Sequence, residues 1–446
     1  MRLVSIAVGR TCRVLTLCAG LAIGCTPRAP PERRLTVFVT AEVRGALEPC
    51  GCESDPLGDA ARFAALVRAA PGAVVVDGGD RHYESAERRE QDEPKARLIE
   101  RIWSLLGRVD EPPAPIVLAG GREAARALAR RGPWIVVQTK GVGEGTPDPE
   151  RVGPGWVVAP ADRLRRVGVI ELVLRGGTIA DAGSPERLAR RAAQLESLLA
   201  GWREETPFVA ARRAEAAKLR ADAARWRPPR AGSAFTWRLV SLDRSRPRDA
   251  QVAAEMRALD FDIARINRAR AEREAEGQPV PLPAGVAGYV GSDACARCHG
   301  AAHALWRATP HGRAFATLVS AGKEWNESCV PCHVTGFGKP GGATIAAARA
   351  LRDVGCENCH GPASLHVADD GLDDPPTLRR AVPEAVCRGC HNPQHSDTFA
   401  YEPYLRDVLA TDEARAHGAA LRARIGDGPT GAELRRAALE KAGAAH

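Results

Sequence analysis

Residues 295–299 read Cys-Ala-Arg-Cys-His, and the same Cys-x-x-Cys-His pattern returns at 329–333, 356–360 and 387–391. Two thiols spaced in this way can each form a thioether with one haem vinyl group, and the next residue then places its imidazole against the iron. A single Cys-x-x-Cys pair fits a zinc ribbon or a disulfide about as well as it fits a haem attachment site. The chain has only 11 His in 446 residues, yet one follows each of the four pairs. The pattern therefore predicts four covalently attached haem c groups.

Each pattern assigns two attachment cysteines and one proximal iron ligand. The predicted thioether cysteines are Cys295, Cys298, Cys329, Cys332, Cys356, Cys359, Cys387 and Cys390. The predicted proximal ligands are His299, His333, His360 and His391. Candidates for the sixth, distal ligands are His303, His311, His366, His395, His417 and His446. A histidine four residues after a proximal ligand lies on the same helical face, so His303 and His395 cannot reach the opposite side of the same haem.

The N-terminus has the pattern of an export signal. Arg2, Arg10 and Arg13 are followed by the apolar run Val14–Ile23, which is far too short to span a bilayer. The run ends in Leu-Ala-Ile-Gly-Cys25, which resembles a bacterial lipobox and makes Cys25 the lipidation candidate, with ordinary cleavage nearby as the alternative. We expect a protein on the periplasmic side of a bacterial membrane, held to it through an N-terminal lipid.

Charge does not point to a nucleic-acid partner, although the net charge is +8 and the pI is near 9.0. Residues 285–446 carry 17 Lys and Arg against 18 Asp and Glu, so the positive surplus lies earlier in the chain. The arginines between about 185 and 275 alternate with glutamate and alanine at helical spacing, which is typical of solvated helix faces. The expected partners are redox proteins, a donor and an acceptor, together with the membrane.

The first half of the chain has the alternation of an α/β layer fold, with Val- and Ile-rich runs between stretches of helical period. The predicted strands are 35–40, 73–77, 134–138 and 167–174. The predicted helices are 59–69, 91–106, a long pair over 182–226 interrupted near Thr206-Pro207, and 249–276. A Gly- and Pro-rich stretch then separates this half from a mainly α, loop-rich haem domain, in which cofactors replace much of the apolar core.

These observations predict at least two domains, because 446 residues exceed the usual size of a single core. The predicted units are a signal peptide over 1–24, an α/β domain over 34–184, a helical extension over 185–276, a linker over 277–288 and the haem domain over 289–446.

The haem domain resembles the cytochrome c-554 family of tetrahaem electron carriers over about residues 288–420. The resemblance lies in the haem motifs and in two further elements, Trp306-Arg-Ala-Thr-Pro-His311 and Cys359-His-Gly-Pro-Ala-Ser-Leu-His366. In that family three haems have two histidine ligands and one is five-coordinate. The resemblance implies that His311, His366 and His417 are the distal ligands, and that the second haem, held by His333, keeps an open position.

Residues 34–184 resemble the calcineurin-like metallophosphoesterase and five-prime-nucleotidase superfamily. The resemblance lies in Thr40-Ala-Glu-Val-Arg-Gly after the first strand and in Val76-Asp-Gly-Gly-Asp80 after the second. A two-metal phosphoesterase centre needs several His and Asp ligands, but His82 is the only histidine before residue 299, and Tyr83 stands where the family has a carboxylate. We expect a degenerate domain that keeps the fold without the hydrolytic centre.

Two cysteines have no assigned chemistry. Of 13 Cys, eight belong to the haem motifs, two lie within the signal and Cys25 is the lipidation candidate, which leaves Cys50 and Cys52. This Cys-x-Cys pair fits a structural disulfide or two buried thiols. A soft-metal site, with Asp80 and His82 as further ligands, is the alternative.

Three functions follow from this sequence. The first is an exported, lipid-anchored tetrahaem cytochrome that relays electrons, with the N-terminal domain as a non-catalytic scaffold or docking module and with no catalytic residue assigned. The second is an oxidoreductase that acts on a small nitrogen or oxygen species at a five-coordinate haem. The third is a metal-dependent phosphoester hydrolase.

Overall fold

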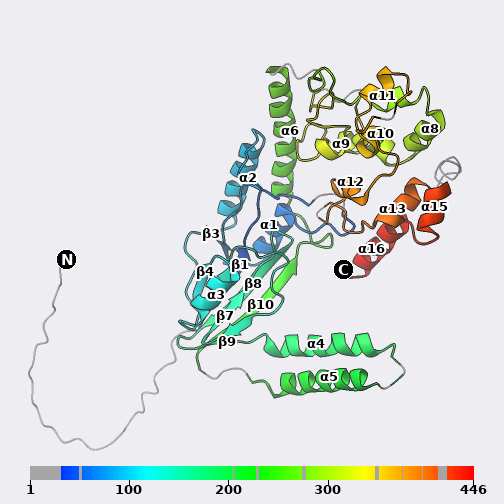
Figure 1. Ribbon diagram of the computed structural model, residues 1–446. Coiled ribbons are helices and arrows are strands. Elements are labelled where there is room, and N and C mark those ends of the chain that lie inside the picture. The colour runs from blue at the N-terminus through cyan, green and yellow to red at the C-terminus, as the bar shows by residue number, and fades with distance from the viewer. Residues whose placement is uncertain are drawn as a thin grey trace, which may run out of the picture.

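The computed structural model describes residues 32–49, 53–202, 204, 206–227, 231–273, 278–346, 351–373, 375–393, 395–409 and 419–445. It shows an α/β body followed by a region of short helices and loops, as the sequence predicts (Figure 1). Five residues singled out by the sequence lie outside the described residues: Cys25, Cys50, Cys52, His417 and His446. The expected signal segment, 1–24, also lies outside them. None of the described helices is long and apolar enough to cross a membrane.

Six strands form the larger sheet, in the order β3-β2-β1-β8-β10-β9. They are β1 (Arg33–Thr40), β2 (Val74–Asp77), β3 (Arg108–Val109), β8 (Arg166–Leu174), β9 (Ile179–Asp181) and β10 (Ser233–Ser241). Strand β1 pairs in parallel with β2 and antiparallel with β8, in a register that places Arg33 opposite Leu174. Its side chains alternate between two cores, because successive residues of a strand point to opposite faces.

The smaller sheet has the order β4-β5-β7-β6. Its strands are β4 (Ile116–Ala119), β5 (Ile135–Gln138), β6 (Glu150–Val152) and β7 (Gly155–Val158). It packs face to face on the larger sheet through a core that includes Val37 and Val39 of β1 and Ile135 and Val137 of β5.

Helices cover the outer face of each sheet. Helix α1 (Ala60–Arg68), α2 (Asp92–Leu105) and α6 (Ala250–Arg273) share a core with the outer side of the larger sheet, and α3 (Arg122–Ala129) covers the smaller one. Asp59 starts α1, because its carboxylate accepts hydrogen bonds from the Ala61 and Arg62 amides at 2.7 and 3.1 Å. The result is a four-layer α/β/β/α body, which confirms the predicted α/β class.

A two-helix hairpin leaves this body between β9 and β10. It consists of α4 (Ser184–Leu199) and α5 (Pro207–Arg225), and Thr206 caps α5 by accepting a hydrogen bond from the Val209 amide at 3.2 Å. The predicted helix pair is thus confirmed, but the chain then returns to the larger sheet as β10, between β8 and β9. The body therefore extends past residue 184, into the segment expected to be a helical extension.

The C-terminal region has little regular structure besides short helices. They are α7 (Ser292–Cys295), α8 (Gly300–Ala308), η1 (His311–Arg313), α9 (Ala314–Ala321), η2 (Val330–Cys332), α10 (Cys356–His360), α11 (Ser364–Ala368), α12 (Glu384–Arg388), α13 (Tyr401–Val408), α15 (Ala419–Ile425) and α16 (Gly431–Ala445). The described part of the expected linker lies against this region, where the Gly288 amide donates to Ser364 Oγ at 2.7 Å.

The body and the C-terminal region meet at the segment that precedes the second haem motif. Asn267 of α6 is fully buried, and its Nδ2 donates to Gln91 Oε1 and to the Trp325 carbonyl oxygen, both at 2.7 Å. Gln91 in turn accepts the Glu327 amide at 3.1 Å and donates through Nε2 to Asn326 Oδ1 at 3.3 Å. The α/β body thus holds the backbone directly before Cys329.

Candidate haem-binding site

The eight predicted attachment cysteines lie in the C-terminal region, and none of them forms a disulfide within the described residues. Four of them pair with a cysteine of another motif. The Cys295 thiol hydrogen-bonds to Cys356, which raises the pKa of Cys295 and lowers that of its partner. Cys332 and Cys390 form a second such pair. The fold therefore brings the first motif to the third and the second to the fourth.

The third and fourth motifs are also close to each other. Burial, together with the nearby Cys387, raises the pKa of Cys359 to about 11. Since the thiols of the first and third, third and fourth, and fourth and second motifs are neighbours, the four attachment points follow one another through space in the order one, three, four, two. This order differs from the order along the chain.

Three proximal histidines are held through the ring nitrogen Nδ1. That atom lies 2.7 Å from the Ala314 carbonyl oxygen in His333, 2.8 Å from the Arg379 carbonyl oxygen in His360 and 3.1 Å from Ser396 Oγ in His391. A hydrogen bond at Nδ1 fixes the tautomer and orients Nε2 for a metal, as is usual for histidines that bind iron or zinc.

Two pairs of histidine rings have centroids at about the separation expected for two ligands of one iron. The His299 and His366 rings are 19° from parallel with centroids 6.5 Å apart, and the His311 and His391 centroids are 6.1 Å apart. Two imidazoles that each bind one metal ion through Nε2 at about 2.0 Å have centroids roughly 6 Å apart. His366 is thereby placed opposite the first proximal ligand and His311 opposite the fourth.

The environment of the second pair favours neutral imidazoles, the form that binds iron. Burial lowers the pKa of His311, and burial together with the neighbouring His311 lowers the pKa of His391 to about 4. His391 also stacks on Phe399, with ring centroids 5.1 Å apart. Paired thiols, oriented imidazoles and facing rings together form a donor set that fits haem c.

A buried carboxylate ties the first motif to the third. Glu357 is 3% exposed and accepts hydrogen bonds from the amides of Val290, Gly291 and Ala363 at 2.8–3.1 Å. Burial raises the pKa of this carboxyl, although the three amides oppose the shift. Glu357 stands between the two cysteines of its motif, so it fixes the backbone that carries both of them.

The remaining predicted ligands are less constrained. His303 Nε2 lies 3.4 Å from Asp293 Oδ1, so the structure does not place it opposite another histidine. His417 lies outside the described residues, as does the Cys50 and Cys52 pair, so these assignments stay predictions.

In the α/β body, arginines occupy the place where the phosphoesterase resemblance would put two metals. Asp77 pairs with Arg81, and Glu42 pairs with Arg44 and accepts the Val142 amide at 2.9 Å. His82 Nε2 lies 2.6 Å from Glu100 Oε1. No group of three or more His, Cys, Asp or Glu side chains within the described ranges is placed to hold a metal ion.

Comparison with protein families agrees with this geometry. Residues 294–361 match the family model described as "Cytochrome c554 and c-prime". The C-terminal region thus carries a segment similar to the cytochrome c554 domain, and we call it the cytochrome c554-type region. That family implies haem c as the cofactor of this segment. The cytochrome c554-type region is also similar to cytochrome c-554 of Nitrosomonas europaea, with 36% identity over 90 residues, which is 17% of this chain and 38% of the relative.

Three solved structures are similar to a larger part of the chain. They are a sulfate thiohydrolase SoxB from Thermus thermophilus (14% identity, 57% of this chain and 63% of that one, TM-score 0.29), a 5'-nucleotidase precursor also from Thermus thermophilus (13%, 65% and 68%, 0.27) and the calcineurin-like phosphoesterase YfkN from Bacillus subtilis (10%, 52% and 98%, 0.26). The fold assignment itself rests on the four layers described above.

Several residues that shape the cytochrome c554-type region were not predicted. The Ala314 and Arg379 carbonyl groups that orient proximal histidines are backbone atoms, for which the sequence has no signal. Glu357 lies in a variable position of its motif, and only its burial shows its role.

Proposed function

We propose that this chain is an exported tetrahaem c-type cytochrome that relays electrons. The contact between thiols of different motifs carries the proposal, since thioethers at Cys295 and Cys356, and at Cys332 and Cys390, would hold four cofactors as neighbours. When bound, haem c supplies one-electron iron chemistry, and close packing favours transfer between haems.

The histidine pairs indicate which haem irons would have both axial positions filled. His299 with His366, and His311 with His391, would fill both axial positions of the first and fourth haems. His417 is the proposed partner of His360 on the third haem, since it is the remaining distal candidate from the family resemblance. A haem iron whose two axial positions are both filled passes electrons without binding a substrate.

The α/β body acts as a non-catalytic scaffold and docking module in this proposal. Its metal-ligand positions are engaged by arginines, as in the Asp77–Arg81 pair, and its helices hold the segment before Cys329. Lys95 of α2 also lies within electrostatic range of Cys329, and burial lowers the pKa of that lysine. The body would thus cover one side of the second haem and direct redox partners to other faces.

Export and the lipid anchor at Cys25 are parts of the same proposal. Thioether attachment of haem takes place outside the cytoplasm, and the N-terminal sequence fits a lipoprotein signal. The mass of the mature N-terminus tests the anchor, because a diacylglycerol-modified Cys25 and an unmodified cleavage product differ by the lipid alone.

Low-temperature EPR of the oxidised protein tests the relay. Neighbouring haems should give low-spin signals that are broadened by magnetic coupling between irons. Four sharp, independent signals would contradict a close-packed chain of haems.

A second candidate is reaction of a small nitrogen or oxygen species at the second haem. Among the described residues no histidine ring lies near His333 or His360, although rings lie near His299 and His391. The family resemblance gives His417 to His360, which leaves His333 as the open position. A high-spin EPR signal that changes on addition of nitric oxide or nitrite would favour this function. An entirely low-spin spectrum would remove it.

A further inference from the structure

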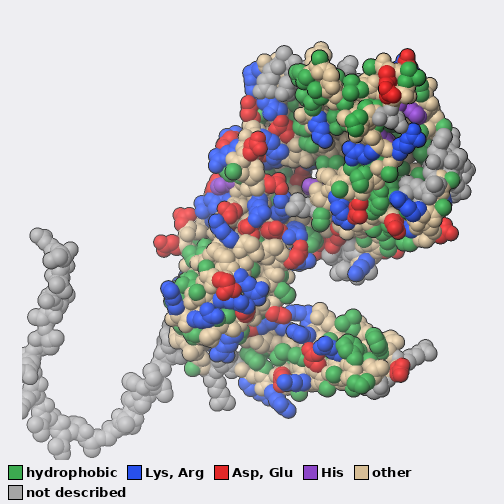
Figure 2. Space-filling view, viewed as in Figure 1, with side chains coloured by type: hydrophobic (Ala, Val, Ile, Leu, Met, Phe, Trp, Pro, Cys, Tyr) green, Lys and Arg blue, Asp and Glu red, His purple; other side chains and the backbone are tan. Residues whose placement is uncertain are grey.

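The α4–α5 hairpin projects from the α/β body and stands apart from the rest of the molecule in the space-filling view (Figures 1 and 2). The two helices pack chiefly against each other, through buried Ala192 and Leu199 of α4 and Val209 and Ala216 of α5. The Glu196–Arg220 ion pair also joins them. By its 16 residues, α4 is about 24 Å long. The hairpin is therefore a self-contained arm.

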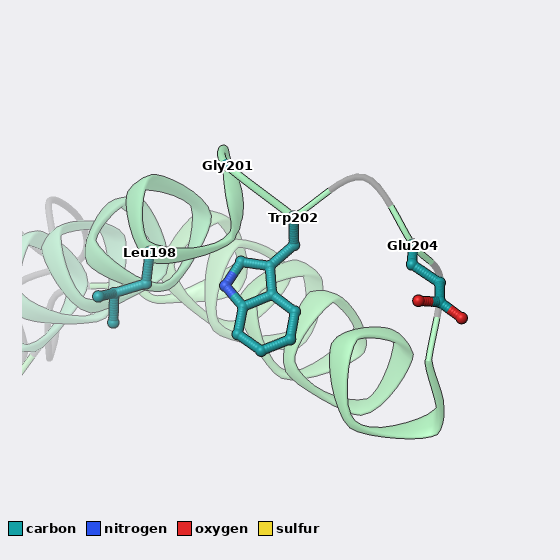
Figure 3. A pocket seen from close by; sticks show the side chains of 4 residues that line it. All are labelled: Leu198, Gly201, Trp202 and Glu204. Carbon is teal, nitrogen blue, oxygen red and sulfur yellow. The ribbon is translucent and has the colours of Figure 1, made fainter.

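The far end of the arm carries large apolar side chains in water. Leu198, Trp202 and Phe208 are 71%, 51% and 56% exposed. Leu198, Trp202 and Glu204 border a shallow hollow there (Figure 3). The Trp202 and Phe208 ring centroids are 6.1 Å apart. Of the three exposed Trp and Phe side chains within the described residues, two are at this tip. Trp202 and Phe208 do not pack into the core of the protein, and a binding partner would explain why they are exposed.

The net positive charge of the arm indicates which kind of partner it would bind. Residues 184–227 hold ten Lys and Arg against six Asp and Glu. Arg212 stacks over the Phe208 ring, with its guanidinium carbon 5.4 Å from the centroid, and also pairs with Glu215. Because Glu204 borders the tip, the positive surplus lies along the arm and not at its end. Tryptophan and phenylalanine next to arginine fit the boundary between the headgroups and acyl chains of an anionic bilayer.

The base of the arm lies at the end of the larger sheet where the described chain begins. Arg33 of β1 pairs with Leu174 of β8, and Ser233 of β10 pairs with Ile179 of β9, directly before the arm. Glu32 follows Cys25 by seven residues, and such a stretch spans at most roughly 25 Å. A lipid at Cys25 and the tip of an arm of similar length can therefore reach the same membrane surface.

We propose that the α4–α5 tip is a second membrane contact, in which Trp202, Phe208 and Leu198 insert into the interface of an anionic lipid bilayer. The proposal depends on the proposed lipid anchor in one respect only: the anchor determines which side of the molecule faces the membrane. Two contacts fix the orientation of a tethered protein, whereas one lipidated residue leaves it free to rotate. The arm would thus set which face of the cytochrome c554-type region is offered to redox partners.

Vesicle binding tests the tip alone in haem-loaded protein that carries Cys25→Ser and is made with a cleavable signal in place of residues 1–24, since this protein lacks both the lipid and the apolar run Val14–Ile23. The protein should sediment with phosphatidylethanolamine–phosphatidylglycerol vesicles and less with phosphatidylcholine vesicles, as followed by haem absorbance. Trp202→Ser and Phe208→Ser should each lower the partition coefficient about tenfold. Phe261→Ser, which changes a 78% exposed aromatic on α6, is the matched control and should have no effect.

The outcomes separate the tip from the anchor. If the lipidated protein binds vesicles and the Cys25→Ser protein does not, the anchor stands and the membrane role of the tip is overturned. If mass analysis shows no lipid but vesicle binding still depends on Trp202 and Phe208, the tip stands and the anchor fails. Loss of self-association in the tip variants, with no vesicle binding in the parent, would assign the tip to a second copy of the chain and overturn the proposal. Unchanged far-UV circular dichroism in the variants shows that the arm remains folded.

Discussion

The ring centroids of His299 and His366 lie 6.5 Å apart, with the ring planes 19° from parallel, and this separation fits two ligands of one iron. They are 67 residues apart in sequence and belong to different structural elements. His299 directly precedes α8, and His366 lies in α11, just after the third haem motif. The segment of the third motif thus carries its own attachment site and, in His366, a candidate ligand for the first haem.

The His366→Gln variant should convert one haem from low to high spin, because glutamine does not replace imidazole as a strong iron ligand. EPR of the oxidised protein measures the change. His303→Gln is the control, since His303 is placed against Asp293 and should leave the spectrum unaltered. A His366→Gln spectrum identical to that of the parent would show that the first haem takes its sixth ligand elsewhere.

Removal of the Asn267 side chain should loosen the junction between the α/β body and the C-terminal region. Asn267→Ala leaves the Trp325 carbonyl without its Asn267 donor and leaves Gln91 Oε1 with the Glu327 amide alone, which costs about 1–3 kcal/mol of unfolding free energy. Chemical denaturation followed by tryptophan fluorescence measures this. Arg273→Ala breaks the exposed pair with Glu90 and should cost under about 1 kcal/mol. Equal losses in both variants would contradict a specific role for the buried network.

Stability should fall as the pH rises through the titration of Glu53. Burial, and then the charge of Asp397 across the junction, raise the pKa of Glu53 to about 7. A carboxyl whose folded pKa lies above its unfolded value binds more protons when folded, so stability decreases as the pH rises from the ordinary glutamate pKa of 4.5 to about 7. Glu53→Gln should therefore raise the melting temperature at pH 8 and leave it unchanged at pH 4. The same difference at both pH values would show that Glu53 does not titrate in this way.

The Glu357→Ala variant should destabilise the segment between the first and third haem motifs. It leaves the amides of Val290, Gly291 and Ala363 without their acceptor, at a cost of about 1–3 kcal/mol for each group that water cannot reach. Denaturation followed at the haem Soret band measures the effect. Glu384→Ala, which removes an exposed partner of Arg388, should change little. A fully stable Glu357→Ala protein would show that other contacts hold these two motifs together.

The sequence predicted the elements with strong periodicity and missed those set by tertiary contacts. Strands β1, β2, β5 and β8 and helices α1, α2 and α6 all lie where the apolar pattern placed them. Strand β10 was missed, because it follows a long hairpin and reads as part of a helical extension. Its place between β8 and β9 depends on partners more than 50 residues away.

In the candidate site, the spacing of Cys and His assigns the attachment residues and the proximal ligands, and these assignments stay predictions. It could not show which distal histidine faces which motif, since the facing of His366 and His299 depends on how α8 and α11 fold together. The hydrogen bonds at Nδ1 of His333 and His360 involve carbonyl oxygens, which every residue carries. Position in space, and not residue type, distinguishes these partners.

The intact mass of the exported protein, produced together with its haem-attachment machinery, tests the central claim most directly. The account predicts a mature chain whose mass exceeds that of the polypeptide by four haem groups, all of which remain bound after denaturation because thioethers hold them. A colourless protein, or one with no covalently added haem mass, would contradict it.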